Sequence, residues 1–405
     1  MRAINERIAL RVLLERGPLT RPELGEFTGL SKPTAFQLLA RLQAAGLVVS
    51  DGMRSGLAGR NAETYRINPA AAHVAAMGVT PGAIEVRVAD ITGAVVGEFV
   101  LPTPDPDGGP PVERLRAALD GAAPPGPLSR VVIGVRAAVD PATGRLGHLA
   151  EADMPGWHLP GLVPTLSAAL GAEVSVENDV NLVALAEQAR GAAAGCPDFV
   201  LLWADDGLGA ALVIGGRLHR GFFGAAGEIC HMPISGTVTA RDGGRHGSHG
   251  FQSVGGGGAI RDLLATYGID RPDFRQSVRA AVAMVEESGR AAVAMAGESG
   301  RAAVAMAGEP GRAAQEAAAG LRLVAGRLAV GLAAIASVVD PGLIVLAGGV
   351  MEAGGERLRD LVERELHVLL PTRPAVRGSE LAGNPVLAGA MDLALATVRD
   401  DLFGR

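Results

Sequence analysis

The sequence contains very little cysteine and no long apolar run. Cys196 and Cys230 are its only cysteines, which excludes a disulfide framework and a cysteine-rich zinc site. The longest uncharged apolar stretch, Leu328–Val339, is shorter than the roughly 18–20 residues that span a bilayer. The opening Met-Arg-Ala-Ile-Asn-Glu has no apolar run behind its charge, so we expect no signal peptide. These absences predict a soluble, cytoplasmic protein with no membrane partner.

Aromatic residues and lysine are also scarce. Phe, Trp and Tyr make up 3% of the chain, so the core must consist largely of Ala, Val and Leu. The shares of hydrophobic residues (48%) and charged residues (20%) are typical of a globular protein. A chain of 405 residues is long enough for about two to three domains.

Charge is distributed unevenly along the chain. The formal net charge is −6, yet residues 1–66 carry nine Arg and the single Lys against six acidic residues, a net of +4. The remainder of the chain therefore carries −10. A small basic segment joined to a large acidic one predicts that only the N-terminal segment contacts a polyanion.

Hydrophobic patterning divides the chain into residues 1–67, 68–198 and 199–405. The first region has a helical period. From Met77 onward, short Val-rich strands alternate with helical segments, which predicts an α/β fold. The expected strands are Ile84–Ala89, Val95–Val100, Val131–Val135, Glu173–Val176, Phe199–Trp203, Ala210–Ile214 and Leu343–Leu346.

An eleven-residue repeat occupies residues 282–314 of the third region. Val282–Ala292 recurs as Val293–Ala303 and again as Val304–Ala314. Each copy contains a Gly in a Ser-Gly-Arg or Pro-Gly-Arg step, which is expected to break a helix. We interpret the repeat as a low-complexity insertion that lengthens a surface helix or loop and has no function of its own.

Three short helices are expected in the first region. Ile4–Arg16 forms the first, and Thr20 opens the second, where Glu23 completes a capping box. Gly29 and Leu30 make the following turn. Ser31 begins the third helix, where its hydroxyl is expected to cap the helix end.

The third helix has one apolar face and one polar face. The apolar face carries Ala35, Leu38, Leu39 and Leu42. Thr34, Gln37 and Arg41 lie on another face, where they can reach base edges or phosphates from the major groove. Ser31 and Lys32 stand at the helix start, and Lys32 can approach a phosphate.

A hairpin is expected after the third helix, with strands at Leu47–Ser50 and Glu63–Ile67. Arg54 and Arg60 lie at its tip, and a cationic hairpin of this kind suits contact with the DNA backbone or minor groove. Residues 1–67 therefore predict a winged helix-turn-helix that binds DNA. The alternative interpretation is an ordinary three-helix packing module.

Five motifs in the larger part of the chain resemble those of one family. They are Val174–Asn181, Gly207–Gly209, Gly221–His231, Ala347–Gly349 and the segment Ser379–Ala390. In this order the motifs resemble those of the ROK family, which comprises repressors, open reading frames and sugar kinases. The resemblance implies a two-lobed, actin-like ATPase fold at residues 68–198 and 199–405, with a C-terminal helix that returns to the first lobe.

The resemblance also implies a sugar site between the lobes. Asn178, Asp179, Glu228 and His231 would contact the sugar, because carboxylates and amides form paired hydrogen bonds with neighbouring hydroxyls. Each assignment has a structural alternative. Asp179 can cap the helix that follows it, and Glu228 and His231 can form an ordinary surface pair. The Gly348-Gly349 turn can approach a nucleotide or can simply join a strand to a helix.

Two departures from the family pattern argue against kinase activity and against bound metal. The family's kinases open with an Asp-x-Gly-x-Thr phosphate loop, and here the matching Gly78–Ala83 has Thr80 at the acidic position. Pro81 also removes a backbone donor, so the loop should hold Mg-ATP poorly. The family's zinc cysteines are replaced by Arg241, Gly243 and Ser248. We expect no metal and no cofactor, although His246 and His249 remain as alternative zinc ligands.

The sequence therefore predicts a DNA-binding transcriptional repressor that senses a sugar or phosphosugar. Its expected partners are a double-stranded operator, the effector and a second copy of the chain, in a homodimer or homotetramer. Two alternatives remain open. One is a sugar kinase with an N-terminal extension, and the other is a regulator whose sensor domain has lost its ligand.

Overall fold

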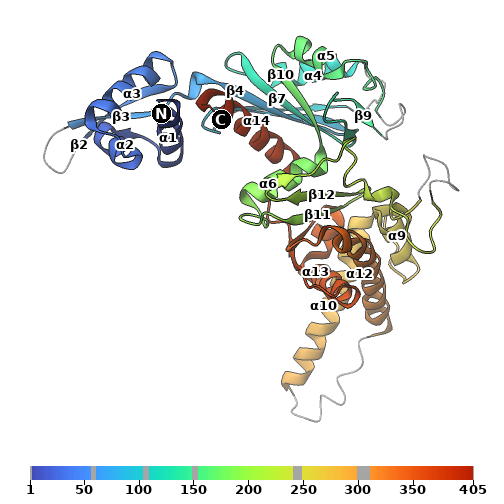
Figure 1. Ribbon diagram of the computed structural model, residues 1–405. Coiled ribbons are helices and arrows are strands. Elements are labelled where there is room, and N and C mark those ends of the chain that lie inside the picture. Colours follow the sequence, from blue (N-terminus) through green and yellow to red (C-terminus); the bar gives the residue numbers. More distant parts are fainter. Residues whose placement is uncertain are drawn as a thin grey trace. The chain divides into compact units, whose positions relative to one another are not determined.

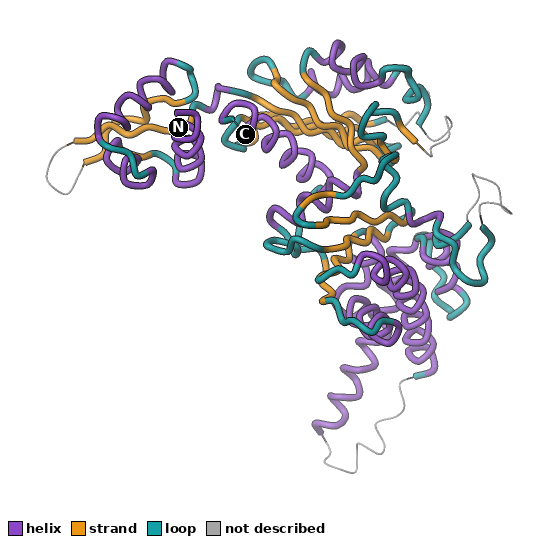
Figure 2. Tube along the Cα trace, viewed as in Figure 1, coloured by secondary structure: helices purple, strands orange, loops and turns teal. Residues whose placement is uncertain are grey.

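The computed structural model describes residues 2–55, 61–103, 109–147, 154–239, 249–298 and 311–404. The chain packs into two compact units, whose helices and strands are shown in Figures 1 and 2. Unit 1 contains residues 1–137, 142–182 and 386–405, and unit 2 contains residues 138–141 and 183–385. This division falls at residue 182, inside a helix, whereas the sequence division was placed at residue 198.

The N-terminal part of unit 1 is a winged helix (Figure 1). Its helices are α1 (Arg2–Arg16), α2 (Arg21–Thr28) and α3 (Lys32–Ala44), and its strands are β1 (Leu19–Thr20), β2 (Val48–Ser55) and β3 (Asn61–Ile67). The strands form an antiparallel sheet in the order β1-β3-β2. The core is formed by the largest buried side chains, which include Leu10, Leu13, Leu24, Leu38, Leu39 and Tyr65.

The helix cap predicted from the sequence forms at α2 but not at α3. Thr20 and Glu23 form the expected capping box, and Gly29 ends α2 with a φ of 68°. Ser31 does precede α3, but the expectation that its hydroxyl caps the helix is wrong. The hydroxyl instead lies 2.9 Å from the hydroxyl of Thr34. The Thr34 hydroxyl competes with the backbone N–H groups of α3 for the Ser31 hydroxyl.

The rest of unit 1 is a mixed five-stranded sheet in the order β10-β7-β4-β5-β6. Strands β4 (His73–Val79), β5 (Ala83–Asp90) and β6 (Val95–Pro102) run antiparallel, and β7 (Leu128–Val135) and β10 (Glu173–Asn178) add in parallel. Figure 1 shows α4 (Pro111–Gly121) and α5 (Leu162–Leu170) on one face of this sheet and α14 (Pro385–Phe403) on the other. The turn η1 (Pro69–Ala71) precedes β4, and β9 is Leu146–Gly147.

Unit 2 repeats this strand arrangement. Its sheet has the order β13-β12-β11-β14-β15. Strands β11 (Phe199–Ala204), β12 (Leu208–Ile214) and β13 (Arg217–Leu218) are antiparallel, and β14 (Leu343–Ala347) and β15 (Ala375–Gly378) are parallel to β11. The same order in both units is the topology expected of a two-lobed, actin-like ATPase fold, and it confirms the predicted α/β class.

Helices cover the sheet of unit 2 and form its core (Figure 1). The helical segments are α6 (Asp179–Arg190), η2 (Ile229–His231), α8 (Gln252–Gly255), α9 (Gly257–Ala265), α10 (Phe274–Glu298), α12 (Arg312–Val339) and α13 (Gly349–Leu369), with β8 at Ala138–Val139. Among the described helices, α12 alone is long and apolar enough by composition to span a membrane. Its Leu321, Leu328 and Leu332 are fully buried in the core, which accounts for this composition.

The first copy of the repeat lies within α10. The expectation that Gly289 breaks the helix is wrong, because α10 continues through it to Glu298. A single Gly costs a helix only about 1 kcal/mol relative to Ala, which a long helix tolerates. Residues 299–310 of the repeat lie outside the described residues.

Candidate functional site

The exposed face of α3 carries all five side chains that were expected to contact DNA from this helix. Ala35, Leu38, Leu39 and Leu42 are buried, as predicted. The side chains left exposed on the opposite side and at the helix start are Ser31, Lys32, Thr34, Gln37 and Arg41. The fold therefore leaves a polar helix surface free of core packing.

Two of the expected cationic contacts are engaged within the protein. Arg41 donates from Nε to the Glu6 carboxylate on α1 at 3.0 Å. Arg54 lies on β2, where it forms an ion pair with Glu23 at 3.0 Å and donates to the Pro18 carbonyl at 2.7 Å. These pairs are half exposed, so their net contribution to stability is about 0–1 kcal/mol and they can exchange partners. Arg60 lies outside the described residues.

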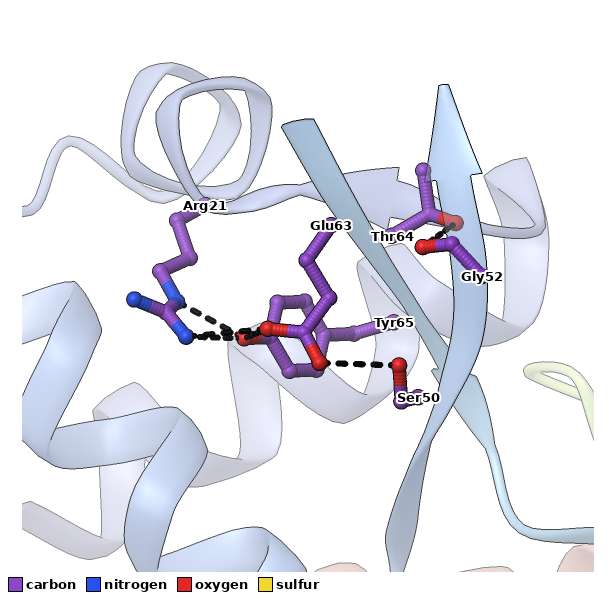
Figure 3. Close-up of polar contacts among 6 residues, drawn as sticks. All are labelled: Arg21, Ser50, Gly52, Glu63, Thr64 and Tyr65. Carbon is purple, nitrogen blue, oxygen red and sulfur yellow. Dashed lines mark hydrogen bonds and ion pairs between the residues drawn. The ribbon is translucent and has the colours of Figure 1, made fainter. Parts of the chain in front are cut away.

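A polar network that the sequence did not reveal connects α2 to the wing (Figure 3). The guanidinium of Arg21 donates to the Tyr65 hydroxyl at 2.8 Å and to Glu63 at 3.1 Å. Glu63 also accepts from the Ser50 hydroxyl at 2.9 Å. The hydrogen bond from Tyr65 is the main reason that the pKa of Glu63 is lowered, and burial raises the pKa of Tyr65. Nearby, the Thr64 hydroxyl donates to the Gly52 carbonyl.

Arg21 also reaches α3. Its guanidinium lies 5.0 Å from the centre of the Phe36 ring, and Phe36 is an exposed residue of α3. A guanidinium over an aromatic ring is attractive. The Arg21 side chain, at the start of α2, therefore contacts both the wing strand β3 and the helix α3.

In unit 1, Asn178 and Asp179 stand where β10 meets α6. The Asn178 amide oxygen accepts from the Asn181 N–H at 3.1 Å, and its nitrogen donates to the Ala137 carbonyl at 3.1 Å. Asn178 thus caps α6, a role that the sequence had offered to Asp179 as an alternative. Asp179 accepts from the Val180 N–H at 2.8 Å. Asn181 is buried and donates to Glu177 at 2.9 Å.

In unit 2, Glu228 and His231 lie at the two ends of η2, directly after a glycine-rich turn. At Gly227 φ is 97°, and a Cβ there would lie 1.9 Å from the Ala210 carbonyl oxygen, so only glycine fits. Ligand atoms of Glu228, Cys230 and His231 lie within 4.8 Å of one another. Burial raises the pKa of the Cys230 thiol to about 12. These residues belong to unit 2, whereas the Asn178-Asp179 pair belongs to unit 1.

In unit 2, a carboxylate of the protein itself binds the backbone of the Gly348-Gly349 turn. The Asp205 carboxylate accepts from the Gly349 N–H at 2.8 Å, at the N-terminus of α13. Arg275 donates to both oxygens of the same carboxylate, at 2.8 and 2.7 Å. A carboxylate at a helix N-terminus satisfies the helix dipole, which is the interaction that a phosphate would otherwise make.

The loop between β4 and β5, which the sequence analysis compared with the kinase phosphate loop, is a closed hairpin. The Thr80 N–H donates to the Ala83 carbonyl at 2.9 Å, and the Thr80 hydroxyl accepts from the Ala83 N–H at 3.1 Å. The Thr103 hydroxyl donates to the Pro81 carbonyl at 3.2 Å. Both polar groups of Thr80 are therefore used within the turn.

Comparison with known proteins supports the motif assignment. The sequence profile of the ROK family matches residues 78–397, and that of the MarR family matches residues 4–53. The chain is 24% identical over 249 residues to the DNA-binding transcriptional dual regulator NagC of Escherichia coli, and the match covers 58% of each protein. It is 22% identical over 238 residues to the xylose repressor of Bacillus subtilis, covering 58% of this chain and 61% of the repressor. The chain thus spans less than two thirds of the length of these relatives.

Solved structures of the same family share the fold. A ROK family transcriptional regulator, a homologue of the Escherichia coli MLC protein, has a TM-score of 0.70 and 19% identity, and covers 99% of this chain and 98% of its own. A ROK family glucokinase from Streptomyces griseus has a TM-score of 0.55 and 27% identity. This match covers 79% of the present chain and 98% of the glucokinase. Because the family profile matches most of the sequence, this chain, with its N-terminal MarR-type winged helix, belongs to the ROK family.

Proposed function

We propose that this protein is a transcriptional repressor that binds operator DNA through residues 1–67 and senses a sugar or phosphosugar through residues 68–405. The observation that carries the proposal is the presence of a winged helix with an exposed polar recognition face in the same chain as a ROK domain. The relatives NagC and the xylose repressor are named as regulators, which supports the same function here.

The proposed DNA contacts are the exposed residues of α3 and the cationic residues of the hairpin. Gln37 and Arg41 would read base edges, and Lys32 would contact a phosphate. The net charge of +4 on residues 1–66 supplies the non-specific attraction to DNA. Arg41 and Arg54 would exchange Glu6 and Glu23 for DNA groups on binding, at little cost because both pairs are exposed.

The proposed effector contacts are Asp179, Asn178, Glu228 and His231. Both polar ends of the Asn178 side chain hold backbone groups, and the Asp179 carboxylate accepts from the Val180 N–H. A sugar that binds one conformation better than the other would shift the equilibrium between them and so alter operator affinity.

The geometry favours a regulator over a sugar kinase. Asp205 and Arg275 occupy the helix N-terminus at Gly349, so a nucleotide phosphate would meet a carboxylate there. In the other unit, Thr80 stands where the family's kinases have an acidic residue, and its polar groups close a hairpin. We therefore propose that the chain has no kinase activity. A coupled ADP-release assay with hexoses should show no turnover, and sugar-dependent turnover would contradict the proposal.

We further propose a cytoplasmic homodimer or homotetramer. A single helix-turn-helix reads only a short half-site, so useful affinity requires two copies on an inverted repeat. A dimer or tetramer is therefore expected in light scattering. A monomer that binds one half-site tightly would contradict this part of the proposal.

Selection from random double-stranded DNA tests the function directly. The full-length protein should enrich one inverted-repeat sequence, and its affinity should fall steeply as salt rises. A thermal-shift screen with xylose, N-acetylglucosamine and their phosphates then identifies the effector, because a ligand of the native state raises the melting temperature. Failure to enrich any sequence at low salt would overturn the DNA-binding assignment. Enrichment with no response to any sugar would favour a sensor domain that has lost its ligand.

A further inference from the structure

Phe36 is an exposed aromatic residue on the same surface of α3 as the proposed DNA contacts. Its surface is 53% accessible. Successive residues of an α-helix are about 100° apart, so Phe36 lies next to Gln37 and almost opposite the buried Leu38. The residue was not among those that the sequence predicted to contact DNA, because its ring has no polar group with which to bind a phosphate or a base edge.

The Phe36 ring is supported by the polar network of the wing (Figure 3). The guanidinium carbon of Arg21 lies 5.0 Å from the ring centre of Phe36 and 5.3 Å from that of Tyr65. Arg21 also donates to the Tyr65 hydroxyl at 2.8 Å and forms an ion pair with Glu63 at 3.1 Å. Tyr65 is only 1% exposed, so the network is anchored in the core of the winged helix. An exposed side chain that is held in this way loses little conformational entropy when it meets a ligand.

The group in the major groove that suits this ring is the C5-methyl group of thymine. Of the four bases, only thymine presents a methyl group there, and Phe is one of the side chains that make apolar contact with it. Phosphates and the other base edges offer charged or polar groups instead. Phe36 lies in the first half of α3, and the N-terminal residues of a recognition helix are those that reach base edges.

A second aromatic pair of the same kind lies outside α3. The guanidinium carbon of Arg16 is 4.3 Å from the ring centre of Phe27, a residue of α2 that is 42% exposed. Single exposed apolar residues are common on protein surfaces and need no ligand. Phe36 differs from Phe27 in its position beside Gln37 on the polar surface of α3. Phe27 is therefore a matched control for Phe36.

We propose that Phe36 contacts the C5-methyl group of one thymine in each operator half-site, and that Arg21 positions the Phe36 ring for this contact. Phe36 is then a specificity-determining residue, because it distinguishes thymine by an apolar group and not by a hydrogen bond. This inference rests on the proposed function, since it requires that α3 read the bases of an operator.

Uracil substitution in the DNA tests the contact. Uracil pairs with adenine as thymine does, but it lacks the C5-methyl group. In the selected operator, each thymine of one half-site is replaced by uracil in turn, and the affinity of the full-length protein is measured by fluorescence anisotropy. At one of these positions the parent should bind the thymine operator about fourfold more tightly, the equivalent of about 0.8 kcal/mol for one buried methyl group. Phe36→Ala should bind the thymine and uracil operators equally at this position and keep the parent's preferences at all others.

Variants of the two aromatic pairs provide the controls. Phe27→Ala should keep the fourfold preference for thymine. Arg21→Ala should reduce it to about twofold, because the ring of Phe36 loses the guanidinium that supports it. Arg16→Ala should leave the preference unchanged. Any variant that binds too weakly is measured at lower salt, where phosphate contacts strengthen all complexes.

The possible failures can be told apart. If the parent shows no preference for thymine over uracil at any position, or if Phe36→Ala keeps every preference of the parent, the proposed contact is wrong while operator binding stands. An unchanged preference in Arg21→Ala would contradict the positioning role of Arg21. Failure to select any operator would overturn the proposed function and this contact together. Circular dichroism shows whether each variant is folded.

Discussion

Nε of Arg41 donates to the Glu6 carboxylate across 3.0 Å, so a side chain expected to read bases from α3 is held against α1. The pair is partly exposed, with 45% of the Arg41 side chain and 33% of the Glu6 side chain accessible. Solvent screens such a pair, and DNA phosphates or bases can compete for the guanidinium. The contact therefore sets the resting position of Arg41 without fixing it.

Changing Arg41 and Glu6 separately tests this arrangement. Arg41→Ala should weaken operator binding by about 1–3 kcal/mol if the side chain pairs with a base. Glu6→Gln should strengthen binding by up to about 1 kcal/mol, because it releases the guanidinium. Fluorescence anisotropy with labelled operator measures both effects.

Controls on α1 separate this contact from general charge effects. Arg11→Ala and Glu15→Gln change the same charges at exposed positions of α1. If Arg41→Ala weakens binding no more than Arg11→Ala does, Arg41 is not a recognition residue.

Asp179→Asn tests the proposed effector contact. The variant should fold normally and bind operator as the parent does, yet need about tenfold more effector to respond, the loss expected for about 1.4 kcal/mol. Asn178→Ala should instead destabilise the protein by about 0.5–2 kcal/mol, because Asn178 caps α6. Titration of operator release with the effector, alongside thermal melts, measures both. A parent-like effector response in Asp179→Asn would reduce Asp179 to a structural role.

Asp205 is expected to stabilise unit 2. Its side chain is 14% exposed and accepts from both Arg275 and the Gly349 N–H. Asp205→Ala should lower the free energy of unfolding by about 2–3 kcal/mol, because it leaves a partly buried guanidinium unpaired and a helix end uncapped. Asp205→Asn should cost about half as much, since an amide can still accept from Gly349.

Chemical denaturation followed by circular dichroism measures the Asp205 series. Asp206→Ala serves as the control, because this neighbouring side chain is exposed. Its change should stay within about 0.5 kcal/mol. If Asp205→Ala and Asp206→Ala lower the free energy of unfolding equally, the charge of the loop, and not the contact with α13, stabilises unit 2.

Glu187 should make stability depend on pH. It is fully buried on α6, and burial raises the pKa of its carboxyl above the ordinary value of 4.5. The folded state therefore binds this proton more tightly than the unfolded state does. Stability from this group is fully present below pH 4.5 and is lost as the pH rises through the higher folded pKa, by at most about 1.4 kcal/mol per pH unit.

Glu187→Gln should remove this loss while keeping an acceptor for the Ala192 N–H, which lies 2.7 Å from the carboxylate. Melting temperatures from about pH 5 to 8 should fall less steeply for the variant than for the parent. Glu356→Gln, at an exposed carboxylate, should follow the parent. Identical pH profiles for Glu187→Gln and the parent would mean that Glu187 ionises in the folded protein without cost.

Most secondary structure could be predicted from the chain, and the exceptions have local causes. All seven expected strands are present, and the Thr20–Glu23 capping box forms as predicted. Strand β4 (His73–Val79) was not predicted, because the buried Ala75 and Ala76 fill strand positions without the branched side chains that mark a strand. Strand β15 was not predicted, because its four residues are too few to show an alternation of apolar and polar side chains.

The sequence alone determined the family, the two sheets and the winged helix, because these follow from short-range patterns: apolar periodicity, capping residues and motif order. Only the tertiary structure decided which side chains are engaged. Arg41 meets Glu6, Arg21 meets Tyr65, Asp205 meets Gly349, and His231 meets His249. These partners lie 18 to 144 positions apart. Their meeting depends on how packed elements bring side chains together in space, which no local pattern encodes.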